Sequence, residues 1–374
     1  RVLSEGAVDS MASRDQSESS PHSYSNGKID PNVSTKAEIS ESVLTEDSVF
    51  DLERKIIPEN ESEPPIDPHN AELLEEIQLI YEKSISPLEN ELHFYEFGND
   101  RLTPSEIKSK PQILLLGQYS TGKTTFIKNF IGQDIPSFKI AMEPSTKNFH
   151  VIMSGKDERT VQGSVLSQIT EFPFSGLEKF GSAFLDQFEA TLCRAEILEG
   201  LTFIDTPGLM GNESQNEEKG YNFIEVARWF AERSDVVLIV FDVHKSDISS
   251  ELRKMLQAVK PHMGKVRVVL NKASEVDLDH LIKVYGALMW GLGRALGKNS
   301  QVPKVYVGGL WTETDNDKSE KSSFEDEEEL RSELMQIHKN LGLKRTSEMI
   351  KRLHRLKVHA SILDHINGSC PRWR

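Results

Sequence analysis

The sequence predicts an α/β fold with a doubly wound, mostly parallel sheet and a flanking helical subdomain. Short, nearly all-apolar segments alternate with helical patterns between residues 106 and 312. Segments of that kind are typical of strands that are buried on both faces of a parallel sheet. A glycine-rich stretch lies between the first such strand and the helix that follows it. In folds of this class the ligand binds at the carboxyl ends of the strands.

The expected elements follow one another along the chain. Leu74, Ile77, Tyr81 and Ile85 recur at helical spacing, which predicts a helix over 71–85 that ends before Pro87. Strands are expected at 113–116, 149–153, 201–204, 236–241, 266–270 and 305–307, and the clearest helices between them at 221–233 and 281–296. After residue 311, a charged loop over 315–329 leads into amphipathic helices that continue to about residue 366.

The stretch after the first strand matches the phosphate-binding loop pattern G-x-x-x-x-G-K-[ST]. Glycines let backbone N–H groups surround phosphates, Lys123 can place a charge between the β- and γ-phosphates, and Thr124 can offer a hydroxyl to Mg²⁺. The alternative is a glycine-rich turn that binds nothing, and Lys and Thr in register disfavour it. The sequence therefore predicts binding of ATP or GTP with Mg²⁺, through Gly117, Gln118, Tyr119, Ser120, Thr121, Gly122, Lys123, Thr124 and Thr125.

Further candidates follow later strands. Asp205 and Gly208 stand just after the strand at 201–204, where a P-loop enzyme needs a carboxylate for Mg²⁺ and a glycine N–H near the γ-phosphate. Thr146 lies in the loop after the first sheet-covering helix, where a hydroxyl can reach Mg²⁺, although this signal is weak when taken alone. The candidate catalytic residues are therefore Lys123, Thr146 and Asp205, and the candidate metal-binding residues are Thr124, Thr146 and Asp205.

The base-binding position departs from the guanine-specific pattern. Residues 271–274 read Asn-Lys-Ala-Ser where guanine-specific proteins carry N-K-x-D, and Ser274 cannot supply the carboxylate that accepts two hydrogen bonds from guanine. Asn271 and Lys272 can still hold a purine, so the sequence does not support a guanine preference. Leu209 follows Gly208 where many small GTPases carry a water-orienting glutamine, and we therefore expect slow intrinsic hydrolysis.

Composition divides the chain into parts. Residues 1–70 hold fifteen acidic and six basic side chains, which accounts for −9 of the net charge of −15, and we expect this segment to be disordered. The expected organisation continues with a helical segment at 71–105, a nucleotide-binding domain at 106–312 and a truncated helical subdomain at 313–374. The remainder of the chain is only mildly acidic, so no nucleic-acid partner is expected. Two cysteines, Cys193 and Cys370, allow at most one disulfide.

The motifs and several blocks in their order resemble the EH-domain-containing (EHD) proteins and their relative sarcalumenin, which are members of the dynamin superfamily. The resemblance covers roughly residues 71–366 and implies a dynamin-type nucleotide domain that forms dimers, with nucleotide state governing oligomerisation on membranes. It assigns Trp290 to the dimer interface and gives Lys123, Thr124, Thr146 and Asp205 the phosphate and metal roles named above. The blocks are 117–126, 143–146, 180–185, 205–209, 220–223, 229–233, 284–290 and 305–311.

Two departures from the family pattern limit what the resemblance implies. EHD proteins end in an EH domain that binds Asn-Pro-Phe peptides, and a helical tip carries their membrane contact. The sequence given stops at Arg374 without such a domain, so we expect no EH-domain peptide ligands, and contact with membrane lipid becomes a weaker expectation. The acidic amino-terminal segment and the blocks 107–111 and 177–181 are closer to sarcalumenin, whereas the loop at 118–121 is closer to EHD.

Three classes of function therefore stay open. The leading one is a slow dynamin-type NTPase whose nucleotide state controls self-association. The second is a scaffold that holds nucleotide without turnover, or a calcium-associated protein of the sarcalumenin type. The third, a monomeric signalling GTPase, is disfavoured by Ser274 and Leu209. The basic stretch 344–359 could face lipid, but a packed helix with a solvated basic face is the preferred interpretation.

Endomembrane association is expected, and the side of the membrane stays open. Triphosphate chemistry and the EHD-like loop favour the cytoplasmic face. The acidic tail, the sequence start without methionine and the sarcalumenin-like blocks favour the lumen of the endoplasmic or sarcoplasmic reticulum. In the lumen, glycosylation of the sequons at Asn32 and Asn60 is expected before that at Asn212.

Overall fold

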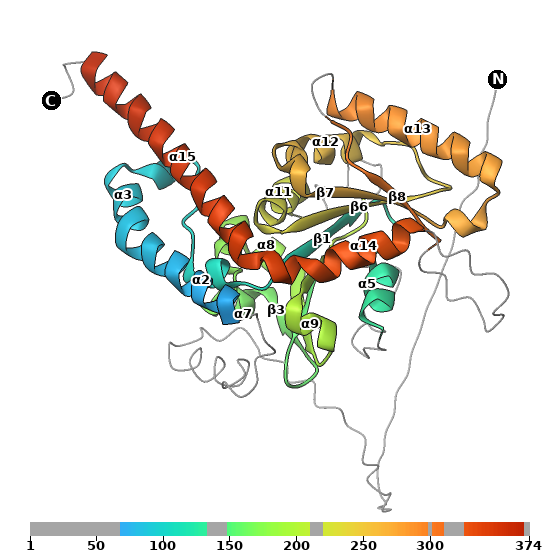
Figure 1. The fold of residues 1–374 in the computed structure, drawn as a ribbon, viewed down its shortest axis with the longest axis horizontal. Helices are drawn as coiled ribbons and strands as arrows, with labels where there is room; N and C mark the ends of the chain where they lie inside the picture. Colours follow the sequence, from blue (N-terminus) through green and yellow to red (C-terminus); the bar gives the residue numbers. More distant parts are fainter. Residues whose placement is uncertain (1–67, 133–147, 210–219, 298–300, 310–324, 370–374) are drawn as a thin grey trace, which may run out of the picture. The chain divides into compact units, whose positions relative to one another are not determined.

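The computed structural model describes residues 68–132, 148–209, 220–297, 301–309 and 325–369. At its centre lies an eight-stranded sheet in the order β3-β4-β2-β5-β1-β6-β7-β8 (Figure 1). The strands are β1 (Gln112–Gly117), β2 (Phe149–Ser154), β3 (Arg159–Gln162), β4 (Phe188–Cys193), β5 (Thr202–Asp205), β6 (Val236–Asp242), β7 (Val266–Asn271) and β8 (Val305–Val307). The predicted α/β class with a doubly wound sheet is confirmed.

Most neighbouring strands are parallel, and the two exceptions lie on one side of the sheet. β2 runs antiparallel to β5, and β3 runs antiparallel to β4, whereas the other pairs are parallel. All six predicted strands are present. The sequence does not predict β3 or β4, because β3 has only four residues and β4 carries Glu189 and Thr191 among its apolar residues.

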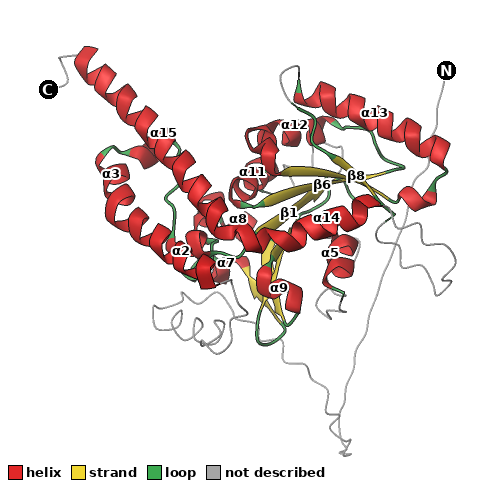
Figure 2. Ribbon diagram, viewed as in Figure 1, coloured by secondary structure: helices red, strands yellow, loops and turns green. Residues whose placement is uncertain are grey.

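Helices cover both faces of the sheet (Figure 1 and Figure 2). On one face, α11 (Phe223–Arg233), α12 (Ser250–Val259) and α13 (Leu278–Leu296) share a buried core with one set of strand side chains. On the other, α5 (Lys123–Ile131), α9 (Glu196–Gly200) and α14 (Glu325–Gln336) share a second core with the alternate set. Adjacent residues of β6 show this alternation, because Leu238 belongs to the second core and Ile239 to the first.

Shorter helical segments connect these layers. They are η2 (Phe94–Phe97), α4 (Pro104–Lys108), α7 (Gly163–Leu166), η3 (Ser175–Phe180), α8 (Ser182–Leu185), η4 (Lys260–Lys265) and η5 (Ala273–Glu275). Thr103 caps α4 through a reciprocal capping box with Glu106, which fixes the approach of the chain to β1.

The amino-terminal helix continues through Pro87, so the predicted end before this residue is wrong. α2 (Pro68–Ile80) runs into a π-helical turn, η1 (Tyr81–Ile85), and then into α3 (Ser86–Glu91). Pro87 stands in the first two positions of α3. At these positions a backbone N–H has no acceptor within the helix, so the N–H that proline lacks is not required. The helix also begins three residues before the predicted start at residue 71.

The carboxyl-terminal part differs from the predicted charged loop. Residues 315–324 lie outside the described part of the chain, but Glu325 to Glu329 form the first turns of α14, so the loop prediction is wrong for these five residues. Four acidic side chains in the first turn stabilise the helix through its dipole. α14 continues through η6 (Ile337–Asn340) into α15 (Leu341–Ser369).

α15 packs along α2 and joins the two ends of the described chain. A small apolar core between them includes Ile77, Tyr81, Met349 and Leu356. Arg352 of α15 is buried and forms a bidentate ion pair with the fully buried Glu89, with N···O distances of 2.5 and 3.0 Å. The predicted solvated basic face of 344–359 is therefore only partly correct, since Arg345 and Arg352 are buried.

Candidate functional site

The loop between β1 and α5 has the form of a phosphate cradle. Lys123, the first residue of α5, folds back so that its Nζ donates to the carbonyl oxygens of Gln118 and Gly117 at 3.0 and 3.4 Å. The Lys123 side chain is buried, and burial lowers its pKa, although Asp205 opposes that effect. The hydrogen-bond partners of this buried cation are neutral carbonyl oxygens. It is therefore positioned to receive phosphate oxygens.

Thr124 and Asp205 meet at the carboxyl edge of β5, next to the loop. The Thr124 hydroxyl donates to Asp205 Oδ2 at 2.5 Å. Asp205 Oδ1 is buried and has no hydrogen-bond partner in the described part of the chain. Burial raises the pKa of Asp205, and the charge of Lys123 together with two hydrogen bonds opposes this rise. A hydroxyl beside a carboxylate with one unused oxygen is the donor set that Mg²⁺ requires in P-loop proteins.

Asn271, at the end of β7, holds the loop from the neighbouring strand. Its Nδ2 donates to the carbonyl oxygen of Thr121 at 3.0 Å. Gly122 has φ of +92°, and a Cβ at this position would lie 2.4 Å from Asn271 Nδ2, so a side chain is excluded by both backbone conformation and space. Sequence reasoning identified Asn271 as a base-contacting residue, and its contact with Thr121 adds a role in shaping the loop.

The Asp-Thr-Pro-Gly segment approaches the loop closely. A Cβ at Gly208 would lie 2.5 Å from the Tyr119 Cα, so only glycine permits this contact. Leu209 exchanges backbone hydrogen bonds with the loop, from Tyr119 N to Leu209 O at 3.0 Å and from Leu209 N to Gly117 O at 3.1 Å. The Leu209 side chain is buried in the first core. It therefore offers no polar group to a water molecule at the γ-phosphate position.

Lys272, which the sequence predicts to support the base, is fixed by two contacts of its side chain. This residue has φ of +63°, and its Nζ donates to Asp242 Oδ2 at 2.6 Å and to Ser120 O at 3.2 Å. Asp242 ends β6 and is buried, and sequence reasoning missed it. The signal in the sequence that could have identified Asp242 was its position directly after the apolar run 236–241. Ser274 lies against Gly309, where a Cβ would be 2.5 Å from Ser274 Oγ.

Most predicted site residues come together at this edge of the sheet. Gln118, Ser120 and Thr121 lie in the loop before Lys123, and Thr125 follows Thr124 in the first turn of α5. Gln118 also donates through Nε2 to Asp247 O at 3.0 Å. Thr146 lies outside the described residues, as do the sequons at 32, 60 and 212 and Cys370. Cys193 is a buried free thiol. Within the described residues, no group of three His, Cys, Asp or Glu could hold a metal ion by itself.

Trp290 lies on α13. Its side chain is 73% exposed, which is unusual for tryptophan. Ile282, eight residues earlier on the same helix, and Leu278, four residues before that, are 61% and 70% exposed. These three residues are spaced at four- and eight-residue intervals, so they follow one stripe of the helix. The stripe is an apolar surface on a charged protein.

Comparisons with known proteins agree with this geometry. Residues 113–273 match the model of the dynamin family. The chain is 40% identical over 304 residues to EH domain-containing protein 1 of Arabidopsis thaliana and 39% identical over 298 residues to the human protein of that name. These alignments cover 80% and 79% of this chain, and the chain spans 56% of the length of each of these curated relatives.

Two solved structures are similar at low sequence identity. A bacterial dynamin from an oligomerised pair that senses and tethers membranes has a TM-score of 0.42 and 15% identity, over 86% of this chain and 59% of that one. Toc33 from Arabidopsis thaliana has a TM-score of 0.37 and 17% identity, over 73% and 92% of the two chains. Both TM-scores are low, so the fold assignment rests on the strand order. Residues 113–273 therefore form a dynamin-type domain, and the chain is similar to the EHD proteins of the dynamin superfamily.

Proposed function

We propose that this chain binds a nucleoside triphosphate with Mg²⁺ and hydrolyses it slowly, and that nucleotide state controls self-association at a membrane. The single observation that supports this proposal most is the cluster of Lys123, Thr124 and Asp205. It combines a buried cation, a hydroxyl and a carboxylate with an unused oxygen. These groups fit a triphosphate and its metal, because Lys123 Nζ bonds neutral carbonyl oxygens and Asp205 Oδ1 has no hydrogen-bond partner in the described residues.

Each residue of the cluster has a distinct role in the proposed reaction. Bound Mg²⁺ would neutralise the negative charge that develops on the phosphate oxygens. Thr124 would hold the metal through its hydroxyl and Asp205 through its carboxylate. Lys123 releases its two loop carbonyls and pairs with phosphate oxygens. We include Thr146 as the proposed switch hydroxyl, a role that the family resemblance implies.

Slow turnover follows from Leu209. This residue is fixed to the loop by two backbone hydrogen bonds and its side chain is buried, so it cannot orient an attacking water. Faster hydrolysis would then require groups that become ordered when protomers assemble. The exposed stripe of α13 around Trp290 is the surface that we propose for self-association.

Base selection is expected to be weak or to favour adenine. Ser274 provides no carboxylate, and it is covered by the backbone of Gly309. Asn271 and Lys272 can contact the plane of a purine ring without hydrogen bonding to the polar groups at its edge. Sites that reject a base strongly do so by leaving its polar groups unpaired, and this site lacks the group required for guanine.

Membrane contact is proposed on the basis of the relatives. No helix in the described ranges is long and apolar enough to cross a bilayer, so we propose peripheral association. The calcium-associated scaffold is less favoured, because the matched family is defined by a dynamin-type domain.

Turnover measured against protein concentration tests the proposal. The rate of phosphate release per protomer should be low in dilute solution and rise with concentration and with anionic liposomes. The affinities for ATP and GTP, measured by competition, should differ by less than about a thousandfold. Binding of either nucleotide without any turnover, at every concentration and with liposomes, would favour the scaffold alternative.

A further inference from the structure

A large cavity lies at the opposite end of the sheet from the phosphate loop. It has a volume of about 880 Å³ and is lined by α2, α4, α11, η4, α14, η6 and α15 together with the first residues of β1, β6 and β7. Nine Lys and Arg side chains line it, against six Asp and Glu. The whole chain has a net charge of −15, so a basic cavity is contrary to its overall composition. This difference indicates that the charge serves a local purpose.

One side of the cavity is a basic stripe on α15. Lys344, Lys351 and Arg355 are seven and four residues apart, so they lie along one face of the helix. Lys265 and His262 of η4 line the same cavity. We call Lys265, Lys344, Lys351 and Arg355 the cation cluster.

Two members of this cluster are already paired, and the other two are not. Lys344 Nζ lies 3.1 Å from Asp235 Oδ1, and Lys265 Nζ lies 3.3 Å from Glu348 Oε1 and donates to the carbonyl oxygen of Glu232 at 2.8 Å. Arg355 reaches Glu232 only at 3.8 Å. Lys351 is exposed, and none of the described carboxylates lies within ion-pair distance of it. Hydrogen-bond donors of Arg355 and Lys351 therefore stay available to a ligand in the cavity.

A buried donor without a partner lies in the wall beside the cluster. Arg345 is 6% exposed, and its Nη1 and Nη2 bond Asp235, Glu348 and Ser109. Its Nε has no hydrogen-bond partner in the described part of the chain. A buried N–H without an acceptor costs free energy, so an acceptor supplied by a ligand would stabilise this arrangement.

Cations of the cluster are among the causes that lower the pKa of neighbouring groups, although burial is the largest cause. Burial lowers the pKa of His262, and Lys265 and Arg355 lower it further against the opposing effects of Glu232 and Glu348. Burial likewise lowers the pKa of Lys344, which Asp235 opposes and Lys265 reinforces. Cations that disfavour each other's protonation are stabilised by a bound anion.

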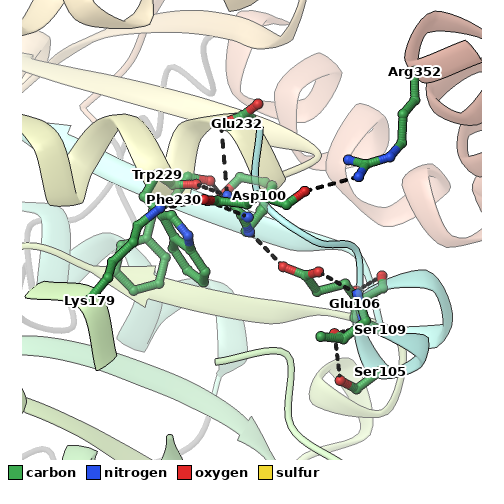
Figure 3. A network of polar contacts seen from close by, with 12 residues as sticks. Asp100, Ser105, Glu106, Ser109, Lys179, Trp229, Phe230, Glu232 and Arg352 are labelled. Atoms are coloured by element: carbon green, nitrogen blue, oxygen red, sulfur yellow. Dashed lines mark hydrogen bonds and ion pairs between the residues drawn. The ribbon is translucent and has the colours of Figure 1, made fainter. Parts of the chain in front are cut away.

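Other parts of the cavity wall are already paired and mark its limits. Asp100 accepts from Lys179 at 2.6 Å, and its carbonyl oxygen accepts from Arg352 at 2.9 Å (Figure 3). Glu106 and Glu232 complete this wall in the same view. The ligand therefore belongs on the side of the cavity formed by η4 and α15, away from this network.

We propose that the cation cluster binds a ligand with two or more phosphate groups at the junction between α15 and the sheet. Such a ligand would contact η4 and α15 together, and so would fix the carboxyl-terminal helix relative to the nucleotide domain. The chemistry is shared by soluble inositol polyphosphates and by the headgroups of phosphoinositide lipids. The proposal does not depend on nucleotide binding, because its residues lie apart from the phosphate loop.

The test uses the full chain saturated with ATP and Mg²⁺, so that the phosphate loop is not available to the probe. Inositol hexakisphosphate is titrated by calorimetry at about 0.15 M ionic strength, and vesicles with and without phosphatidylinositol 4,5-bisphosphate form a second arm. The test variant Lys351→Gln/Arg355→Gln removes two exposed cations of the cluster. The control variant Lys357→Gln/Arg253→Gln removes two exposed cations outside the cavity.

We expect one-to-one binding that the test variant weakens by at least about tenfold and the control leaves unchanged. The His262 imidazole should also shift its NMR resonance on binding. Soluble binding with no preference for phosphoinositide vesicles identifies a soluble ligand, and binding in the vesicle arm identifies a lipid headgroup. The proposal is overturned if neither inositol hexakisphosphate nor the phosphoinositide vesicles bind. It is also overturned if the test variant and the control variant lose the same amount of affinity. Fluorescent ATP binding is measured separately, so a failure of nucleotide binding is not mistaken for a failure here.

Discussion

Removal of the Asp235 carboxylate should destabilise the junction between α15 and the sheet. Asp235 directly precedes β6 and is 1% exposed. Its carboxylate accepts four hydrogen bonds or ion pairs. They come from the Gln112 backbone N–H at 2.9 Å, from Lys344 Nζ at 3.1 Å and from both terminal nitrogens of Arg345 at 3.3 Å. Asp235→Ala leaves the buried Arg345 without its main partner. Breaking a buried pair on one side costs about 3–5 kcal/mol.

The assay is urea unfolding of the full chain, followed by circular dichroism, with Glu232→Ala as a matched control. Glu232 is about half exposed and lies 3.8 Å from each of its arginine partners, Arg233 and Arg355, so its removal should cost less than about 1 kcal/mol. A loss below 1 kcal/mol for Asp235→Ala would refute the reasoning and show that apolar contacts alone hold α15.

The same network predicts a dependence of stability on pH. Burial by itself would raise the pKa of Asp235, but Arg345, Lys344 and the Gln112 N–H hold it below its ordinary value. The ionised group therefore stabilises the fold above the unfolded-chain pKa of about 3.9, and this contribution is lost as the pH falls toward the folded value. The difference between wild type and Asp235→Ala should narrow below about pH 4.

Three further outcomes are expected. Trp290→Ala should weaken self-association about thirtyfold in sedimentation, as for an interface hot spot, whereas the exposed Met335→Ala should not change it. Asn271→Ala should lower nucleotide affinity about tenfold in a fluorescence titration, because the loop loses its bond at Thr121, and unchanged affinity would contradict the clamp. Deletion of residues 1–67 should leave the melting temperature nearly unchanged, since that segment is poor in apolar groups, and a loss of several degrees would contradict this.

The sequence predicts the parts of the fold that local pattern determines. Apolar runs identify six of the eight strands, and the match to the phosphate-loop pattern places Lys123 and Thr124 at the start of a helix. The mixed polarity of β4 hides it, because its partners on both sides supply the burial that its own sequence does not indicate. Pro87 is tolerated because a π-helical turn precedes it, and the chain gives no separate signal for that turn.

Contacts between distant residues were beyond local pattern. Arg345 and Arg352 look like members of a solvated basic face, and their partners Asp235 and Glu89 stand 110 and 263 residues away. Asp242 beside Lys272 is likewise visible only once β6 and β7 are adjacent. The basic cavity is the product of such contacts, since its lining comes from seven helical segments and three strands.

Nucleotide binding by Lys123→Ala, compared with wild type, tests the central claim most directly. Titration of labelled ATP and GTP with Mg²⁺ should show binding by wild type and by the control Lys108→Ala, which changes an exposed lysine. Lys123→Ala should lose about 2–4 kcal/mol of binding free energy while keeping the wild-type circular dichroism spectrum. A folded Lys123→Ala variant that binds both nucleotides as tightly as wild type would contradict the account.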